Sequence, residues 1–326
     1  MIKTARGALA AVAIVVCATA AQAQDWPARP LTMVVPSAAG SASDAVGRIL
    51  AEGLSAALSQ QVIVENVGGS SGMTGAARVA NAPPDGYQFL LGSVDTMAID
   101  QTLYKNPPYN SNTDFTPAGL VIEQPIILIT RADLPVNSLP EFIAYTKVNQ
   151  SRMQFGSDGI GSGSHLACAR LNAAIGAEPA HVPYSGSAQA LQDLAAGRID
   201  YFCALGADAI APLQARTAKA IAVLGRDRSP QFPDIATAAG QGLPNVDSYF
   251  WSGWFFPKDT PDPVVMKMAV ATAVTLGSAA TQKRLERAGV SVVARERRPP
   301  AFLRRFIGAE IEKWAAAIKA SGVSME

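Results

Sequence analysis

Two segments rich in glycine and serine carry the residue types that best suit the binding of a small anion. The first, residues 37–44 (SAAGSASD), follows a short apolar run and precedes a segment with helical periodicity. The second, residues 156–165, holds four glycines within its first eight positions. Small side chains allow the backbone to approach a ligand closely, and the free N–H groups of a first helical turn favour negative charge. The chemistry expected at both segments is noncovalent binding by N–H and hydroxyl groups.

Each segment also has a plainer interpretation. For residues 37–44, an ordinary loop with Ser41 or Ser43 as the N-cap of the next helix fits the sequence equally well. The second segment is close to a dinucleotide-binding turn, but Ser164 stands where the third glycine of G-x-G-x-x-G is required. Nucleotide binding is therefore not expected.

A serine hydrolase is the enzymatic alternative, since its nucleophile lies on a G-x-S-x-G turn at a strand end. The sequence spells this pattern at Gly68–Gly72, which we interpret as a flexible turn. Of the two histidines in the chain, His165 is expected to cap or pack at a helix start, and His181 is expected in the core of a strand. We therefore expect no catalytic residues and no enzymatic activity.

Carboxylates and metal ligands offer little further chemistry. Asp85, Asp95 and Asp100 fall in expected turns without a shared element, so we expect them to be solvated. No group of histidines, cysteines or carboxylates has the sequence spacing of metal ligands. We therefore expect neither a metal nor another cofactor.

Short, β-branched apolar runs alternate along the chain with segments of helical periodicity, as a mostly parallel sheet covered on both faces requires. Val46, Leu50, Leu54 and Leu58 form one apolar stripe and predict a helix over residues 44–59. In such folds ligands bind beyond the carboxyl ends of strands, where both segments described above fall. The predicted strands are residues 31–36, 61–66, 88–93, 125–131, 153–157, 181–184, 200–205 and 219–224.

Length and composition favour two α/β lobes. A chain of 326 residues exceeds one ordinary core, and a hydrophobic content of 49% is enough to bury two. We expect residues 24–124 and 232–326 to form a discontinuous first lobe, and residues 125–231 to form the second. A charged stretch with prolines from Arg226 is expected to cross back to the first lobe, and the part from Asp262 onward is expected to be helical.

The first residues predict export from the cytoplasm. Lys3 and Arg6 precede an apolar run, and residues 21–23 (AQA) have the small-x-small form of a signal peptidase site. We expect residues 1–23 to be removed as a signal peptide and the mature protein to be a periplasmic monomer. The formal net charge of the whole chain is +1 with the two signs interspersed, which argues against nucleic-acid binding.

Two cysteines remain after the expected cleavage, Cys168 on a predicted helix and Cys203 in a predicted strand. Disulfides persist in the periplasm, but a bridge requires the two α-carbons to lie within about 7 Å. The sequence leaves open a disulfide or two buried thiols, of which buried thiols are preferred.

A series of motifs along the whole expected mature chain resembles one family of receptors. The sequence is similar to the substrate-binding proteins of tripartite tricarboxylate transporters, the Bug receptor family. The motifs are residues 26–40 (WPARPLTMVVPSAAG), Asp44, 62–66 (VIVEN), Gly72, 84–87 (PDGY), 114–115 (DF), 161–166 (GSGSHL), 181–186 (HVPYSG), 193–200 (DLAAGRID) and 312–314 (EKW).

The resemblance implies a two-lobed periplasmic binding protein, type II-like, with its ligand cleft between the lobes. Such a receptor holds a small carboxylate between two loops and delivers it to membrane transporter subunits. The family's ligand contacts carry over to Ser37, Ala39, Gly40, Ser41 and Asp44 in the first loop, to Gly161, Ser162 and Ser164 in the second, and to Ser93 and Asp208 at other strand ends.

Two departures from the family pattern concern the ligand. The first loop usually contains Pro-Phe-x-x-Gly-Gly, whereas Ser37 follows Pro36 here and Ser41 follows Gly40, which predicts a wider or wetter pocket. Residues 236–239 (ATAA) lack the proline and the acid of a usual Pro-Thr-x-x-Glu pattern. The sequence therefore leaves open which carboxylate is bound, and whether the partner is a permease or a signalling protein.

Overall fold

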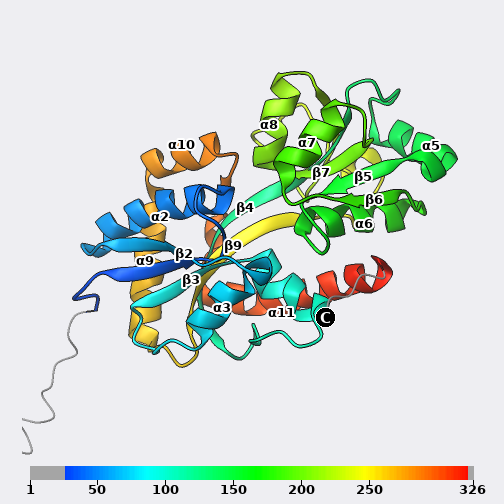
Figure 1. Ribbon diagram of the computed structural model, residues 1–326. Helices are drawn as coiled ribbons and strands as arrows, with labels where there is room; N and C mark the ends of the chain where they lie inside the picture. Colours follow the sequence, from blue (N-terminus) through cyan, green and yellow to red (C-terminus); the bar gives the residue numbers. More distant parts are fainter. Residues whose placement is uncertain (1–25, 322–326) are drawn as a thin grey trace, which may run out of the picture.

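A computed structural model describes residues 26–321, so the expected signal peptide lies outside the described residues. The chain folds into two α/β lobes that lie side by side, with the first at the left of Figure 1 and the second at the upper right. Their ten strands belong to one hydrogen-bonded network with the main order β2-β1-β3-β9-β4-β7-β5-β6.

The first lobe is built on a sheet in which β1 is parallel to β2 and β3, while β9 is antiparallel to β3 and β4. Helices α2, α9 and α10 cover one face, and α3, α4 and α11 cover the other. The strands are β1 (Leu31–Val35), β2 (Val62–Asn66), β3 (Gln88–Ser93), β4 (Phe115–Arg131), β9 (Tyr249–Pro257) and β10 (Ser291–Val292). The helices are α2 (Ala42–Leu58), α3 (Met73–Ala80), α4 (Asp100–Leu103), α9 (Asp262–Gly277), α10 (Ala279–Arg287) and α11 (Pro300–Ser321), with the π-helical turn η2 (Asp95–Ile99) before α4.

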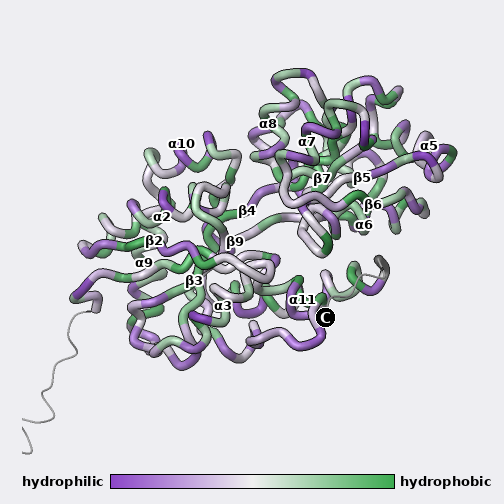
Figure 2. Tube along the Cα trace, viewed as in Figure 1, coloured by the Kyte–Doolittle hydropathy of each residue, from purple (hydrophilic) through white to green (hydrophobic). Residues whose placement is uncertain are grey.

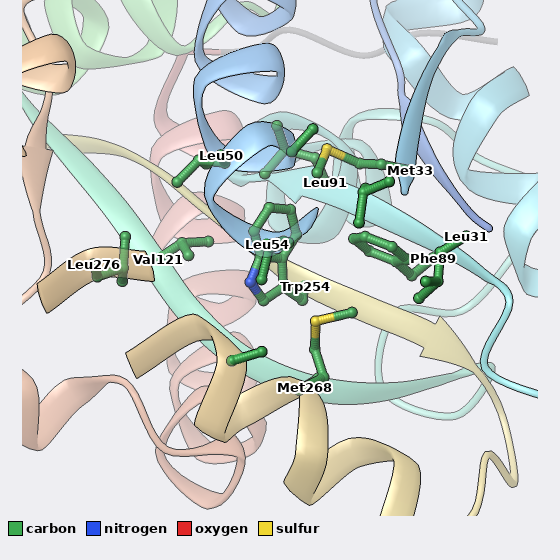
Figure 3. Close-up of a cluster of buried hydrophobic side chains, with 14 of the residues drawn as sticks. Leu31, Met33, Leu50, Leu54, Phe89, Leu91, Val121, Trp254, Met268 and Leu276 are labelled. Carbon is green, nitrogen blue, oxygen red and sulfur yellow. The ribbon is translucent and has the colours of Figure 1, made fainter. Parts of the chain in front are cut away.

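The apolar stripe expected on the first helix is the face that α2 buries. Leu50 and Leu54 are fully buried and belong to one cluster with Phe89 and Trp254, whose rings lie 5.4 Å apart at nearly a right angle. Figure 3 shows these side chains converging from the helix and the sheet. Packing of this stripe fixes the start of α2, and with it the serine-containing loop that precedes the helix.

The second lobe has a smaller sheet with helices on both faces. In it β5 is parallel to β6 and β7, while β7 and β8 are antiparallel to β4. Its strands are β5 (Gln154–Ser157), β6 (Ala180–Pro183), β7 (Tyr201–Leu205) and β8 (Ala218–Leu224), and its helices are α5 (Leu139–Asn149), α6 (Gly163–Ile175), α7 (Ser187–Ala195) and α8 (Gly206–Gln214). The short 3-10 turns η1 (Ser70–Gly72) and η5 (Arg295–Arg297) lie in the first lobe. The turns η3 (Gln150–Arg152) and η4 (Ala239–Gln241) lie beside the elements of the second lobe.

Helix α6 and strand β7 are joined by a disulfide between Cys168 and Cys203, whose α-carbons lie 5.6 Å apart. The preferred expectation of two buried thiols is therefore wrong. Both residues are fully buried in the same cluster as Phe142 and Tyr201, so the bridge crosses the core of the second lobe.

Two long strands join the lobes. Strand β4 pairs with β9 from Phe115 to Pro125, and from Ile126 to Arg131 it pairs with β7 and β8. Figure 1 shows β4 and β9 running beside each other from one lobe to the other. Strand β4 therefore changes its pairing partners between Pro125 and Ile126.

The stretch that follows the expected lobe boundary at residue 232 packs against the second lobe. Phe232, Ala238 and Val246 pack into the cores of the second lobe, and the backbone at Thr237 forms a bridge with Val223 of β8. Its apolar side chains are buried there, and β9 begins only afterwards, at Tyr249.

Hydrophobic residues follow the strands of both lobes, and hydrophilic residues gather on the outer helices and loops (Figure 2). Within the described residues no single helix meets the length and hydropathy of a membrane span. The pair α9 and α10, bent by 73°, meets them only when both helices are taken together.

Candidate ligand-binding site

A cavity of about 210 Å³ lies where the carboxyl ends of β1 and β3 meet the strands that join the lobes. At about 30 Å³ for each water in the liquid, it has room for roughly seven waters or one small organic molecule. Its wall combines polar and apolar groups. The lining residues are Pro36, Ser37, Ala42, Ser43, Val46, Ser71, Leu91, Ser93, Asp95, Thr96, Ile122, Gln124, Leu205, Phe250 and Ser252.

The loop between β1 and α2 is organised by Asp44. Its carboxylate Oδ2 accepts hydrogen bonds from the backbone N–H of Gly40 at 2.8 Å and from Nε of Arg48 at 3.1 Å. Burial acts to raise the pKa of Asp44, but the hydrogen bonds from Gly40 and Arg48 outweigh it and the pKa lies below its usual value. Ser41 is the N-cap of α2, and its Oγ accepts from the Asp44 N–H at 3.2 Å.

Of the five residues expected to bind ligand in this loop, the structure brings Ser37 to the cavity wall. Its Oγ lies 2.9 Å from Oγ of Ser41. Ala39 and Gly40 are exposed and do not line the cavity. Ser41 and Asp44 do not line it either, but their hydrogen bonds hold the loop in its conformation. Ala42 and Ser43, at the start of α2, line the cavity instead.

The loop between β5 and α6 is held by its own polar groups. Ser162 is the N-cap of α6, with its Oγ accepting from the His165 N–H at 3.3 Å. The Gly161 N–H donates to Nδ1 of His165 at 3.0 Å, and Oγ of Ser164 accepts from the Asp158 N–H at 3.0 Å. The polar groups of these three predicted ligand residues are therefore engaged by neighbouring residues of the loop and of the first turn of α6.

The same loop meets the first lobe at η2 and α4. A β-carbon on Gly163 would lie 3.4 Å from Oδ1 of Asp95, and one on Gly161 would lie 2.1 Å from Cδ2 of Leu103. Gly161, Ser162 and Ser164 do not line the cavity directly. The loop instead approaches it through Asp95, which is one of the lining residues.

The two remaining predicted residues lie at other strand ends. Ser93 ends β3 and lines the cavity, and its N–H donates to Oγ1 of Thr96 at 3.0 Å, which fixes the start of η2. Asp208 lies in the first turn of α8, after β7. Burial raises the pKa of Asp208, and a hydrogen bond with Ser187 acts in the opposite direction.

The expectation that Asp95 and Asp100 are solvated is wrong. Asp100 is 0% exposed, and burial together with Asp95 raises its pKa to about 8. Burial also raises the pKa of Asp95 to about 6. The π-helical turn explains the error, because the Asp100 N–H donates to the carbonyl five residues back, at Asp95, which brings both carboxylates to one side of the turn. Asp85, in contrast, is exposed and pairs with Arg29.

The cavity also contains residues that sequence reasoning missed. Gln124 of β4 and Phe250 and Ser252 of β9 line it because these strands cross between the lobes at its base. The strand β9 was not predicted, since its aromatic run is buried on both faces and lacks the alternation of a half-exposed strand.

The two histidines stack on each other with ring centroids 3.9 Å apart, and Nε2 of His181 lies 2.7 Å from Oγ of Ser157. Burial lowers the pKa of each histidine to about 4, so both are neutral at pH 7. Ser157 is fully buried, and its hydroxyl also donates to the carbonyl of Gly159. This arrangement stabilises the second loop and engages the Ser157 hydroxyl within it.

A larger hollow of about 610 Å³ lies between α10, β10 and η5, with Pro230 and Gln231 at its edge. It is lined by Gln282, Glu286, Arg295 and Arg298 among others. We favour the smaller cavity as the candidate site because it lies at strand carboxyl ends between the lobes, where α/β folds bind ligands. Within the described chain no group of three histidine, cysteine or carboxylate side chains is arranged to hold a metal ion.

Comparisons with known proteins agree with this architecture. A family model described as the tripartite tricarboxylate transporter family receptor matches residues 46–323. The structure of the periplasmic binding protein BugD is 35% identical, with a TM-score of 0.79 over 92% of this chain and 100% of BugD. MatC from Rhodopseudomonas palustris with bound malate is 33% identical, with a TM-score of 0.78 over 90% of this chain and 100% of MatC.

A third structure, R. palustris Rpa4515 with adipate, is 30% identical and has a TM-score of 0.81 over 92% of this chain and 99% of its own. Family members of this kind are receptors rather than enzymes. The extent of the family match, the two-lobed fold and the cleft between the lobes lead to one conclusion: the chain belongs to the receptor family of tripartite tricarboxylate transporters, which are periplasmic solute-binding proteins.

Proposed function

We propose that this receptor captures a small carboxylate in the cavity between its lobes and delivers it to the membrane subunits of a tripartite tricarboxylate-type transporter. One observation carries the proposal: loops from different lobes meet at one cavity. Ser37 lines it from the first lobe, and Gly163 of the second lobe lies against Asp95 in its wall. The malate and adipate bound by two relatives are small carboxylates of fitting size.

Binding by N–H and hydroxyl groups supplies enough free energy without an arginine. A hydrogen bond to a charged group contributes about 1.5–3 kcal/mol, and a helix N-terminus adds about 0.3–1 kcal/mol. A micromolar complex requires about 8 kcal/mol net. Four to six such bonds, formed at the α2 N-terminus and by the serines of the cavity, reach this value after the entropic cost of association.

Closure follows if the ligand contacts both lobes better in the closed state than in the open state. We propose that the described parts of residues 24–124 and of 247–326 move as one body, and that residues 125–246 move as the other. The movement is expected to bend β4 and β9 where β4 changes its pairing partners.

The experiment is a titration of the mature protein with malate, adipate, succinate and citrate, measured by calorimetry at low and at moderate salt. We expect at least one of these acids to bind. Its affinity should fall less than about threefold between low and moderate salt, because salt screens enclosed hydrogen bonds only weakly. Incubation with the ethyl esters of these acids, followed by nuclear magnetic resonance, tests the hydrolase alternative, since a receptor leaves the esters uncleaved and returns the bound acid unchanged. No binding of any acid, or a collapse of affinity with salt, would contradict the proposal.

Delivery to a permease and docking on a signalling partner use the same closed form of the receptor. A transport assay separates them: deletion of the receptor is expected to abolish uptake of its ligand by cells. Restored uptake after expression of the receptor, but not of a variant that does not bind, supports delivery to a transporter. Unchanged uptake in the deletion strain would favour the signalling role.

A further inference from the structure

The outer face of α9 is apolar, whereas a surface helix normally presents charged and polar residues to the solvent. Met266, Val270 and Val274 are spaced by four residues and therefore lie on one side of the helix, where they are 57%, 61% and 60% exposed. Together with Ala269 and Ala273 they line a hollow of about 580 Å³. A contiguous apolar face of this kind marks a surface that contacts another molecule.

Two arginines stand at the edge of this hollow. Arg295 and Arg298 line it, and they also line the hollow of about 610 Å³ between α10 and β10, so the two hollows meet at these side chains. Arg297, which lies between them in the sequence, forms an ion pair with Glu123. Within residues 26–321, neither Arg295 nor Arg298 has such a partner.

The two guanidinium groups lie close enough to influence each other. Burial and the charge of Arg295 lower the pKa of Arg298, while Glu296 acts in the opposite direction. Nε of Arg298 donates to the carbonyl of Val293 at 2.8 Å, which holds the side chain in place. A carboxylate from outside would relieve this repulsion, because it accepts two parallel hydrogen bonds from a guanidinium group.

The chain around the two hollows carries an excess of positive charge. Residues 283–305 hold eight lysines and arginines and two glutamates, although the formal net charge of the whole chain is only +1. Arg284 and Arg297 are neutralised by Glu52 and Glu123, which still leaves a positive surplus. Charge complementarity therefore favours an acidic partner.

A protein segment with apolar and acidic side chains matches this surface better than a second copy or a membrane. A symmetric contact between two copies would bring their arginines together. A bilayer surface is met by a protruding apolar face, whereas Met266, Val270 and Val274 line a hollow. Apolar side chains of a protein segment can enter that hollow while its carboxylates bind Arg295 and Arg298.

We propose that the receptor docks through this surface on the membrane subunits of its transporter, by binding a periplasmic segment of those subunits that carries apolar and acidic side chains. The docking surface consists of Met266, Val270, Val274, Arg295 and Arg298. The inference rests on the proposed function, delivery of a ligand to a transporter, and assigns the surface that delivery uses. None of the five residues lines the cavity between the lobes, so mutations can separate docking from ligand binding.

Matched variants separate the docking surface from the rest of the molecule. Val270→Glu places a carboxylate in the apolar hollow, and Arg295→Glu reverses the charge at its edge. Val148→Glu and Arg152→Glu make the same changes at exposed positions of the second lobe that line neither hollow. All four sites are exposed, so we expect every variant to fold and to bind ligand within twofold of the wild type. Urea unfolding and calorimetry verify both points.

Uptake of the ligand is then measured in cells that lack the receptor gene and express each variant at equal level. We expect Val270→Glu and Arg295→Glu to reduce the initial rate of uptake at least tenfold, while the two control variants keep the wild-type rate. Wild-type rates in both docking-surface variants would overturn the docking surface and leave delivery to a transporter intact. Failure of the wild-type receptor to restore uptake would contradict both proposals.

A binding measurement identifies the occupant of the surface. The membrane subunits of the transporter, purified together in detergent, are the probe, and biolayer interferometry measures their affinity for the ligand-loaded receptor. We expect each docking-surface variant to bind them at least ten times more weakly than its control. Vesicles of phosphatidylethanolamine and phosphatidylglycerol without protein test the membrane alternative, and sedimentation velocity tests the second copy. If the two substitutions instead abolish binding to the vesicles or dissociate a receptor dimer, the occupant is lipid or a second copy, and the proposal is wrong.

Discussion

Gly161 of the second lobe packs against Leu103 of the first, so closely that a β-carbon on the glycine would lie 2.1 Å from Cδ2 of the leucine. The leucine is buried and belongs to a first-lobe cluster that also takes in Leu166 of α6. Gly161 has a φ of +79°, a value that favours glycine. The backbone conformation and the contact across the lobes therefore both select glycine at this position, whether or not the residue touches ligand.

Replacing Gly161 with alanine is expected to weaken ligand binding at least tenfold. The added methyl group must displace Leu103 or hold the loop away from the first lobe, which opposes the closed state. The left-handed backbone adds about 1–2 kcal/mol of strain. Calorimetric titration with the best ligand measures the affinity, and urea unfolding measures the stability.

Gly176 supplies the matched control for this substitution. It also lies in the second lobe, at the C-cap of α6, with a φ of +67° and no atom within 4 Å of an added β-carbon. Gly176→Ala is expected to lose a similar amount of stability while keeping its affinity. Equal affinities for the two variants would mean that the contact between Gly161 and Leu103 does not control closure.

Asp44 is expected to matter through the shape of the first loop. Asp44→Ala removes the acceptor for the Gly40 N–H and for Arg48, and it is expected to lower the free energy of unfolding by about 1–3 kcal/mol. Urea unfolding at pH 7 measures this loss. Asp85→Ala is the control, because its exposed ion pair with Arg29 and its exposed hydrogen bond from the Tyr87 N–H are together expected to contribute less than the buried carboxylate of Asp44 does. Equal effects at the two positions would argue against the organising role of Asp44.

The disulfide is expected to stabilise the second lobe strongly. Cys168 and Cys203 are separated by 35 residues. Closing a loop of this length lowers the conformational entropy of the unfolded chain and so stabilises the folded state by about 2–4 kcal/mol. The double variant Cys168→Ala and Cys203→Ala is expected to unfold at correspondingly lower urea concentration. Wild-type protein unfolded and refolded in a reductant should approach the variant, and no difference between oxidised and reduced wild type would contradict the assignment.

The sequence predicted those parts of the fold whose signals are local. Eight apolar runs gave strands in the right places, and the stripe on α2 gave a helix with the right buried face, because each depends on periodicity within a few turns. Strand β9 was not predicted, because both of its faces are buried and its residues alternate neither in size nor in polarity. Its neighbour, the first half of β4, was missed for the same reason.

The candidate site could be predicted only in part from the sequence, and the reason is different. The two loops were recognised by their glycines and serines, but which side chains reach the cavity depends on contacts between lobes. Asp95 and Gln124 illustrate this, because neither belongs to a motif and both line the cavity through long-range packing. Asp100 lies near Asp95 only because a π-helical turn separates them, and no regular spacing of residues in the sequence predicts such a turn.

The raised pKa of Asp100 predicts that the protein becomes less stable as the pH rises. Burial and Asp95 raise the pKa of Asp100 from 3.8 to about 8 in the folded protein. The folded state therefore holds this proton between about pH 4 and 8 while the unfolded state has released it, so the stability it contributes is complete below pH 4 and declines as the pH rises to 8. In Asp100→Asn this decline is absent. Relative to that variant, the free energy of unfolding of the wild type should fall by up to about 1.4 kcal/mol per pH unit between pH 5 and 8. Urea unfolding of both proteins across this range measures the difference, and parallel profiles would show that Asp100 titrates near its ordinary pKa.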